Sequence, residues 1–564
     1  MTLSHYASVP LVTAMLLLLG ADALAQQVPT AGSQLQQISA LPPKTTTTSP
    51  VLEVPKDSIP TTSRADVRRL KVVGLQFSGA SALSEAELVK ICGFVPGQRY
   101  SFVELHELAA RVTSHYRSLG YFLAQTYLPS QDVTEGLVQF QVVEGQYGAI
   151  KLTNQSRMSD HVAAHVLESL KSAGAVTASD LERRLLMLSD LPGINVKSVL
   201  VPGASTGTTD LQVNVSDGRT LGGSLEADNH GNLFTGAQRA GASVFFNQPA
   251  GIGDLATLRF LTSGPDLTYG QATYQALLGG LTAGVSLADL RYRLNGEFAS
   301  IQSSGSAQVR SFYLSYPMIR SRNSNLSLQW SSDEKLLSDR TEVGSLGNTS
   351  EKFARLSTTS LRGDFRDSWG PAFNDYAATW THGSIDLRDP IARDLDLLSA
   401  HSQGDFDKLT FSAGRLQHVS ADVQLYARLS GQWASKNLDA SEKFSLGGAG
   451  SVRAFPSGEA AGDEGASLTL EVRSNLPQIS EHISGKLQLI AFLDAGFIQL
   501  NKRTWEAETA ANRRELQGAG LGLAYSGPEN LMVKTYYAFK LGNEVAQSQA
   551  DAPGRFWLQL SKPF

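Results

Sequence analysis

A run of alternating strands from Leu221 to the last residue constrains the fold of this chain more than any other feature. Successive side chains of a strand point to opposite faces, so apolar and polar residues in alternation predict a sheet with one face of each kind. We count sixteen candidates, and Gly, Asn, Asp, Ser and Pro separate them. They start near Leu221, Gln238, Asp254, Leu267, Leu281, Ser306, Asn325, Phe353, Asp375, Lys408, Val423, Ser467, Lys486, Glu515, Leu531 and Arg555.

The end of the chain indicates where such a sheet lies. Phe556, Leu558 and Leu560 alternate with polar residues, and the chain ends on Phe564. A final amphipathic strand that ends on an aromatic residue is typical of bacterial outer-membrane barrels, in which it closes against the first strand. An even strand number suits an antiparallel barrel, and about sixteen strands enclose a lumen. The sequence therefore predicts a transmembrane β-barrel over residues 219–564, with outer-membrane lipid around it.

The longest break between strands, residues 437–466, contains an arginine with a possible partner inside the barrel. Arg453 lies in a glycine-rich stretch without alternation, which predicts a long loop. Alternation in the strand near Lys486 places Asp494 on the lumen face, so the two charges can meet only if the loop folds inward. Glu471 also faces the lumen and competes for Arg453. The alternative is a solvated loop charge, the commonest fate of arginine.

Two consecutive α+β segments with the same plan precede the barrel. Each predicts a strand, two helices and two more strands, over residues 70–146 and 147–218. The expected elements are Leu70 to Phe77, Ser84 to Cys92, Phe102 to Leu119, Tyr121 to Leu128 and Leu137 to Val143, and then Ala149 to Thr153, Ser159 to Ala173, Ala178 to Leu188, Asn195 to Val201 and Leu211 to Val215. The helices carry apolar residues at helical spacing, so they pack on one sheet face. The sheet edges stay available for an extended partner.

The N-terminal residues 1–25 have the features of a secretory signal peptide. An apolar stretch from Val9 to Leu19 precedes the small-residue site Ala23-Leu24-Ala25. The stretch is too short for a membrane anchor. Residues 26–69 are rich in Pro and Thr and predict an extended arm and linker. Within the arm Ser33 to Leu41 can form two helical turns, which need a docking site to be stable.

The composition argues against several other functions. A net charge of -5 and a pI near 6.1 disfavour a nucleic-acid binder. Gly203-Ala204-Ser205-Thr206-Gly207 fits the G-x-S-x-G pattern of hydrolases, but it lies between two predicted strands, where a turn is the simpler interpretation. The single Cys92 excludes an internal disulfide and a cysteine-rich metal site, and the histidines lack metal-site spacing. We therefore expect no enzyme, no cofactor and no metal.

Short motifs along the chain occur together, in the same order and spacing, in one known family. They are Gly120-Tyr121-Phe122, Tyr127-Leu128-Pro129, Val143-Glu144-Gly145, Asp228-Asn229-His230-Gly231, Thr235-Gly236, Asn247-Gln248-Pro249, Gly251-Ile252-Gly253-Asp254, Gly447-Gly448, Val452-Arg453-Ala454-Phe455 and Phe492-Leu493-Asp494-Ala495-Gly496. On these motifs the chain resembles the TpsB transporters of two-partner (type V) secretion, the haemolysin and adhesin secretion/activation proteins of the POTRA-plus-barrel superfamily. The resemblance covers nearly the whole mature chain.

The resemblance implies an outer-membrane translocase whose two periplasmic POTRA modules recognise an unfolded TpsA-type exoprotein. It implies that the exoprotein crosses through the barrel and folds outside, that Arg453 of the loop bonds to Asp494, and that an N-terminal helix plugs the lumen. It also implies insertion by the barrel-assembly machinery. The family usually has Gly where this chain has Ala454, and if that position required a positive φ, alanine would cost roughly 1 kcal/mol.

Two other functions remain open from the sequence. An insertase for other barrels usually carries more POTRA modules, and a passive porin needs neither soluble modules nor the Arg453 loop. The sequence does not distinguish which partner is exported: a haemolysin, an adhesin, a contact-dependent toxin and a haem-scavenging protein all fit this architecture.

Overall fold

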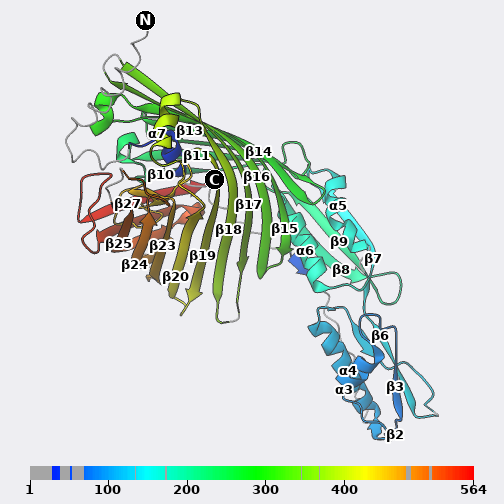
Figure 1. The fold of residues 1–564 in the computed structure, drawn as a ribbon. Helices are drawn as coiled ribbons and strands as arrows, with labels where there is room; N and C mark the ends of the chain where they lie inside the picture. Colours follow the sequence, from blue (N-terminus) through cyan, green and yellow to red (C-terminus); the bar gives the residue numbers. More distant parts are fainter. Residues whose placement is uncertain are drawn as a thin grey trace.

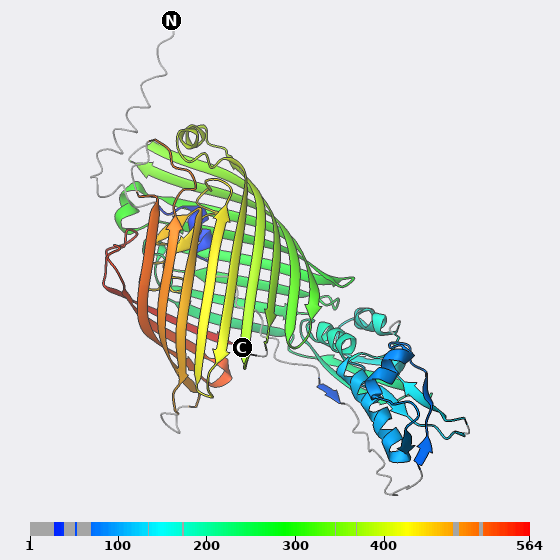
Figure 2. The ribbon, with the colours of Figure 1, turned by 60° about the horizontal axis from the view of Figure 1, so that its bottom comes forward.

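The structure is a computed structural model that describes residues 28–38, 51–53, 69–133, 135–171, 174–343, 346–367, 369–477, 484–506 and 511–564. Two small α/β modules extend from one end of a closed barrel (Figures 1 and 2). We call the barrel end beside the modules the near end and the opposite end the far end. The predicted signal peptide and most of the arm lie outside the described residues.

The first module packs two helices on a small sheet. Its elements are β2 (Arg69–Lys71), β3 (Gly74–Ser78), α3 (Glu85–Cys92), β4 (Arg99–Ser101), α4 (Phe102–Ser118), β5 (Gln125–Tyr127) and β6 (Leu137–Val143). The sheet has the order β3-β6-β5, and β2 pairs with β4. Each helix begins after a serine that forms a capping box with a glutamate, Ser84 with Glu87 and Ser101 with Glu104. These boxes satisfy backbone N–H groups that a helix start leaves unpaired.

Two strand predictions in this module were too long. The stretch from Leu70 to Phe77 is divided into β2 and β3, which pair with different strands. Of Tyr121 to Leu128 only β5 pairs, because the N–H of Ala124 closes a turn on the carbonyl of Tyr121. Alternation alone does not show which part of an apolar run has a strand beside it.

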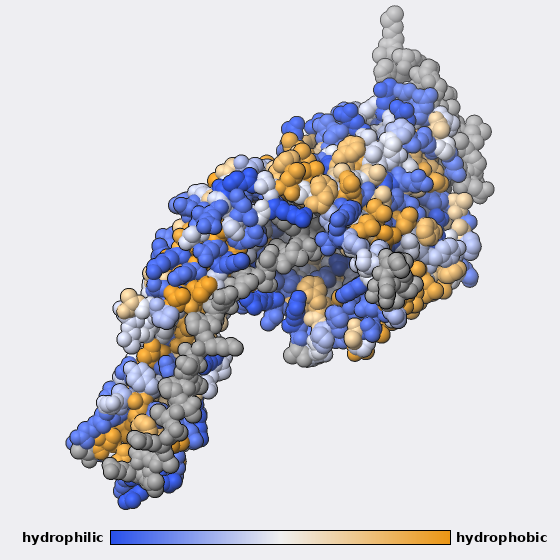
Figure 3. Space-filling view, turned by 180° about the vertical axis from the view of Figure 1, so that it is seen from behind, coloured by the Kyte–Doolittle hydropathy of each residue, from blue (hydrophilic) through white to orange (hydrophobic). Residues whose placement is uncertain are grey.

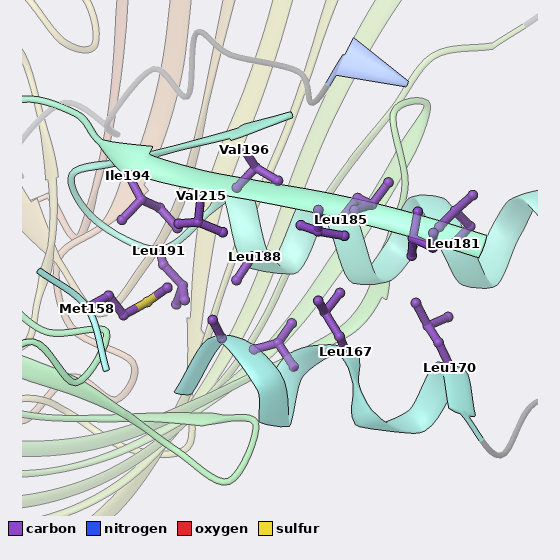
Figure 4. Packing of buried hydrophobic residues seen from close by; sticks show 14 of the residues in the cluster. Met158, Leu167, Leu170, Leu181, Leu185, Leu188, Leu191, Ile194, Val196 and Val215 are labelled. Carbon is purple, nitrogen blue, oxygen red and sulfur yellow. The ribbon is translucent and has the colours of Figure 1, made fainter. Parts of the chain in front are cut away.

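The second module has the same plan with longer strands. Its elements are β7 (Gln146–Gln155), α5 (Asp160–Lys171), α6 (Ala178–Ser189), β8 (Ile194–Pro202) and β9 (Thr208–Asp217). Leucines of both helices pack against the strands in one core, in which Leu167 of α5 and Leu185 of α6 lie together with Val196 of β8 (Figure 4). No helix that the structure describes is both long enough and apolar enough to cross a bilayer.

Two pieces of the arm are described, α2 (Ala31–Gln36) and β1 (Val51–Glu53). The helix lies inside the barrel against β14, β15 and β16 (Figure 2). We expected it from Ser33 to Leu41, but it begins two residues earlier because Thr30 caps it in a box with Ser33. It ends at Gln36, and residues 39–41 of the prediction lie outside the described part. β1 pairs in parallel with β8 of the second module.

The predicted barrel is confirmed as a closed antiparallel sheet of sixteen strands. Neighbours in sequence pair throughout, except that β20 pairs with β23. The strands are β10 (Leu221–Asp228), β11 (Arg239–Asn247), β12 (Leu255–Thr262), β13 (Leu267–Leu278), β14 (Leu281–Arg293), β15 (Ser304–Arg320), β16 (Ser324–Val343), β17 (Leu346–Phe365), β18 (Ala372–Leu387), β19 (Gly404–His418), β20 (Val423–Ala434), β23 (Glu464–Asn475), β24 (Lys486–Gln499), β25 (Arg513–Ser526), β26 (Met532–Lys540) and β27 (Gly554–Pro563). The last strand closes the barrel against β10 in five residue pairs, from Ser224↔Pro563 to Asp228↔Gln559.

The wall has the two faces that alternation predicts. In β24, Leu493 is 53% exposed on the outside, whereas its neighbour Asp494 is 2% exposed and points into the lumen. The space-filling view shows apolar patches on the outer surface of the barrel beside polar ones (Figure 3). The lumen face is therefore where polar partners for the loop can lie.

The second module is attached to the near end of the barrel by polar and apolar contacts. The guanidinium of Arg320 in β15 donates two hydrogen bonds to Asp190, at 2.6 and 2.7 Å. Arg183 of α6 donates to the carbonyl of Pro317 at 3.1 Å, and Leu277 packs against the core of the module. Bidentate arginine–carboxylate bonds fix geometry well, so these contacts hold the module beside the near end.

Candidate functional site

The loop between β20 and β23 folds into the lumen. It descends through β21 (Phe444–Leu446) and returns through β22 (Ala460–Gly462), which pair with each other. Between them Val452, Ala454 and Phe455 are fully buried and pack with apolar residues of the wall. The loop tip is thus a packed part of the barrel interior.

Arg453 at this tip meets Asp494 of β24. Its Nε and Nη2 donate to the two carboxylate oxygens, each at 2.8 Å, and its backbone N–H donates at 3.1 Å. The hydroxyl of Thr469 donates to the same carboxylate at 3.0 Å. The Arg453 side chain is 4% exposed and that of Asp494 is 0% exposed, so water does not compete for these bonds.

Glu471 is a second partner of Arg453 and not a substitute for Asp494. The remaining guanidinium nitrogen, Nη1, donates to Glu471 at 2.7 Å. Arg473 donates to the other oxygen of Glu471, also at 2.7 Å. Two arginines therefore face two carboxylates, so each buried carboxylate has a cationic partner, as buried ionic groups require.

Aromatic side chains complete the surroundings of Arg453. Its guanidinium carbon lies 3.5 Å from the ring centre of Phe492 and 5.0 Å from that of Tyr536. A cation over an aromatic face is attracted by about 2 kcal/mol when desolvated. On the backbone side, the indole N–H of Trp557 in β27 donates to the carbonyl of Arg453 at 2.7 Å. The loop tip thus contacts β23, β24, β26 and β27.

The strain that alanine would have caused at position 454 does not arise. Ala454 is not among the non-glycine residues with a positive φ, so its backbone does not require glycine. The glycine that this contact requires lies instead in the wall. A Cβ placed on Gly518 would lie 2.5 Å from the Cβ of Ala454, far inside van der Waals contact. Gly518 therefore allows the loop tip to approach β25.

Gly496, the last residue of the predicted wall motif, has a similar role. A Cβ at this position would lie 3.0 Å from the side chain of Leu446, where the loop enters the lumen. The ring of Phe455 lies 5.8 Å from the Nζ of Lys540. The structure thus brings together every site residue that the sequence indicated: Val452, Arg453, Ala454, Phe455, Glu471, Phe492, Asp494 and Gly496.

A second buried ion pair holds the returning half of the loop. Glu459 accepts a bond from Arg514 of β25 at 2.8 Å. The backbone N–H groups of Gln547 and Ser548, on the segment between β26 and β27, donate to the same carboxylate at 2.7 and 3.2 Å. This contact lies on the same side of the barrel as Arg453.

Three lysines on the opposite side of the lumen hold the start of the loop, and we call them the lysine cluster. Lys352 of β17 bonds to Asp439 at 2.7 Å, while Lys335 of β16 and Lys408 of β19 bond to Glu442 at 2.6 and 2.8 Å. The two carboxylate side chains are 6% and 2% exposed. Sequence alternation places these lysines on the lumen face, but the tilt and register of the strands decide which loop acid they reach.

The lumen helix α2 lies between the wall and this loop. Its first N–H, that of Ala31, donates to Asp339 of β16 at 2.7 Å, and Gln34 accepts from Thr235 at 2.9 Å. A Cβ added to Gly32 would lie 2.5 to 3.0 Å from the Cβ, Cα and N of Ser441. Backbone atoms cannot move aside easily, so only glycine lets the helix lie this close to the loop.

Comparisons with known proteins agree with this architecture. Residues 207–525 match the family model described as haemolysin secretion/activation protein ShlB/FhaC/HecB, and residues 70–145 match the ShlB-type POTRA domain. The chain is 28% identical to the heme/hemopexin transporter protein HuxB of Haemophilus influenzae, over 85% of this chain and 84% of that protein. It is 23% identical to the outer membrane transporter CdiB of Dickeya dadantii, over 80% and 79%. The solved structure of CdiB from Escherichia coli has the same fold, with a TM-score of 0.71, 18% identity and coverage of 89% and 92%.

Proposed function

The chain belongs to the ShlB/FhaC/HecB family of haemolysin secretion/activation proteins, and from this premise we propose that it exports one large exoprotein through its own barrel. It is an outer-membrane transporter with POTRA modules in the periplasm. The near end of the barrel is therefore periplasmic and the far end extracellular. We assign residues 70–146 and 147–218 to the two modules and 219–564 to the barrel.

The observation that carries this proposal is the occupied lumen. A barrel of about sixteen strands encloses a wide lumen, and here both the Arg453 loop and α2 lie inside it. A diffusion pore needs neither. Two separate elements held inside by ion pairs, hydrogen bonds and apolar packing are suited to a path that opens only for a particular polypeptide.

The modules support recognition of an extended chain. β8 is the edge of the second module's sheet, and β1 of the arm pairs there over Val51 to Glu53. An unfolded exoprotein could use the same main-chain groups by strand addition. We propose that it replaces β1 at β8, so that recognition displaces the arm that leads to α2.

Two alternative functions are less favoured. The family match is to secretion transporters, and an insertase usually carries more POTRA modules than the two of this chain. We also propose that the protein is no enzyme and takes no cofactor, since the buried charges of the loop tip and of the lysine cluster are engaged in ion pairs with one another. The outer-membrane lipid and the barrel-assembly machinery are further partners that we expect.

Deletion of the gene in its own bacterium tests the proposed function. Comparison of the culture medium before and after deletion should show the loss of one large secreted protein, and the wild-type gene supplied in trans should restore it. Unchanged secretion together with altered assembly of other barrels would favour the insertase. A loss of small-solute uptake alone would favour the porin.

A further inference from the structure

The extracellular end of the barrel carries a short, firmly held helix, α7 (Pro390–Leu397), between β18 and β19. Its N-terminus is capped by Asp389, with proline at the first position. The carboxylate of Asp396, in the last turn of the helix, accepts bonds at 2.8 and 3.0 Å from the N–H groups of Ser402 and Gln403, which follow the helix. The guanidinium of Arg393 donates to the carbonyl of Leu387 at 2.9 Å. These contacts fix the orientation of the helix.

This helix exposes its apolar side. Ile391 and Leu395 of the helix and its C-cap residue Leu398 follow at the i, i+4 and i+7 spacing of one helical face. They are 62%, 61% and 79% exposed. We call these three residues the α7 stripe. Surface helices usually turn such a face to the protein core, so an exposed stripe on a fixed helix indicates a binding surface.

Membrane lipid does not fit as the occupant of the α7 stripe. The outer face of β18 is apolar at Trp380, but beyond it His382 faces Asp407 of β19, with 3.1 Å between Nδ1 and Oδ1. Asp386 follows on the same face of β18. From Trp380 to Leu387 the strand rises roughly 23 Å along its axis. The stripe therefore lies beyond a polar band, outside the hydrocarbon layer. Figures 1 and 2 show α7 at the end of the barrel opposite the modules.

The segment that follows α7 contacts the start of the lumen loop. Asn437, near the start of the lumen loop, donates to the carbonyl of Ala400 just after α7, at 2.8 Å. Lys436 donates to the carbonyl of Gln403 at 2.7 Å. A polypeptide that leaves the barrel past this loop thus meets the segment that carries α7.

From these contacts we infer that the α7 stripe is the first extracellular docking site for the exported polypeptide, an inference that depends on the proposed function. An emerging chain is unfolded and exposes apolar side chains, and each one buried on the stripe strengthens binding by about tenfold or more. Transient binding of a few such residues opposes backward movement of the chain until enough of it has emerged to fold. The stripe thus favours outward transfer without an energy source in the membrane.

The test compares export by variants with intact barrels. The triple variant Ile391→Gln, Leu395→Gln, Leu398→Gln removes the stripe with a residue that favours helices. Leu397→Gln is the matched control, because Leu397 is 55% exposed but lies off the stripe. The protein lost from the medium on gene deletion should appear roughly tenfold more slowly with the triple variant, since loss of one such contact already exceeds a factor of ten. The control should export at the wild-type rate.

Cross-linking identifies the occupant in the same cells. A photoreactive benzoylphenylalanine in place of Leu395 should form an adduct with the exported protein, and the same group in place of Leu409, on the outer face of β19, should not. An adduct only with lipopolysaccharide or only with a second copy of this chain overturns the inference, as does an unchanged export rate in the triple variant. If the wild-type protein exports nothing, the proposed function fails. If the wild-type protein exports its partner and the triple variant exports it at the same rate, the proposed function stands and only the inference about α7 fails.

Discussion

The indole N–H of Trp557 donates a 2.7 Å hydrogen bond to the carbonyl oxygen of Arg453, so the last barrel strand holds the tip of the lumen loop. β27 is also the strand that closes the barrel against β10. Both residues are buried, and the side chain of Arg453 bonds at the same time to Asp494 of β24. The position of the loop is thereby coupled to the strand that completes the wall.

Arg453→Ala should abolish export while the barrel still inserts into the membrane. The substitution leaves Asp494 and Glu471 buried without their shared cation, and removal of one partner from a buried ionic group costs about 3 to 5 kcal/mol. The loop then leaves its position, whereas the wall keeps its sixteen paired strands. Secreted protein and heat-modifiable mobility on gels measure the two effects separately. Arg291→Ala, which removes an arginine side chain that is 73% exposed, is the control and should export normally.

Gly518→Ala should displace the loop tip, and Ala454→Gly should reverse the effect. The added methyl group would lie 2.5 Å from the Cβ of Ala454, and removal of that Cβ restores the space. Overpacking of this kind costs about 1 to 3 kcal/mol. The export rates of the wild type, the two single variants and the double variant are compared in a double-mutant cycle. If the double variant is as defective as Gly518→Ala, the close contact between positions 454 and 518 is not the cause.

Lys352→Met should loosen the start of the loop at the extracellular side. It leaves Asp439 buried without its cation, whereas Lys352→Met combined with Asp439→Asn removes both charges. Loss of one partner is strongly destabilising, but loss of both is far less so. Single-channel recordings should therefore show more frequent large openings for Lys352→Met than for the double variant. Equal opening frequencies in the two would indicate that the ion pair does not restrain the loop.

The sequence predicted the barrel and the lumen position of its acidic residues because both depend on a local period, whereas the bond between Arg453 and Asp494 was implied by the family resemblance. Alternation within β24 places Asp494 on the lumen face, and alternation within β23 does the same for Glu471, whatever the neighbouring strands do. The lysine cluster was not predicted, since Lys335, Lys352 and Lys408 belong to three different strands. The relative tilt and register of these strands cannot be read from a local sequence pattern. The start of α2 was missed for a related reason. Thr30 caps the helix, and the distant Asp339 accepts the N–H of Ala31.

The last prediction concerns pH and the first module. Burial by itself raises the pKa of Glu144, but hydrogen bonds from Ala82, Ser81 and Tyr116 outweigh burial and hold this pKa below its ordinary value of 4.5. The carboxylate accepts from the N–H groups of Ala82 and Ser81 at 2.8 and 2.7 Å and from the Tyr116 hydroxyl at 2.9 Å. A carboxyl group whose pKa is lower in the folded state stabilises the fold fully above its unfolded pKa, and this stability is lost as the pH falls through the folded value.

Glu144→Gln should therefore destabilise the first module at neutral pH by about 1 to 3 kcal/mol, because it weakens several buried hydrogen bonds. The difference from wild type should shrink as the pH falls below 4.5. Hydrogen exchange of the α4 and β6 amides in the full-length protein measures this local stability at each pH. Glu107→Gln, on the exposed side of α4, is the control and should show little change at any pH. A constant difference between Glu144→Gln and wild type across the acid range would mean that Glu144 acts through packing and not through its charge.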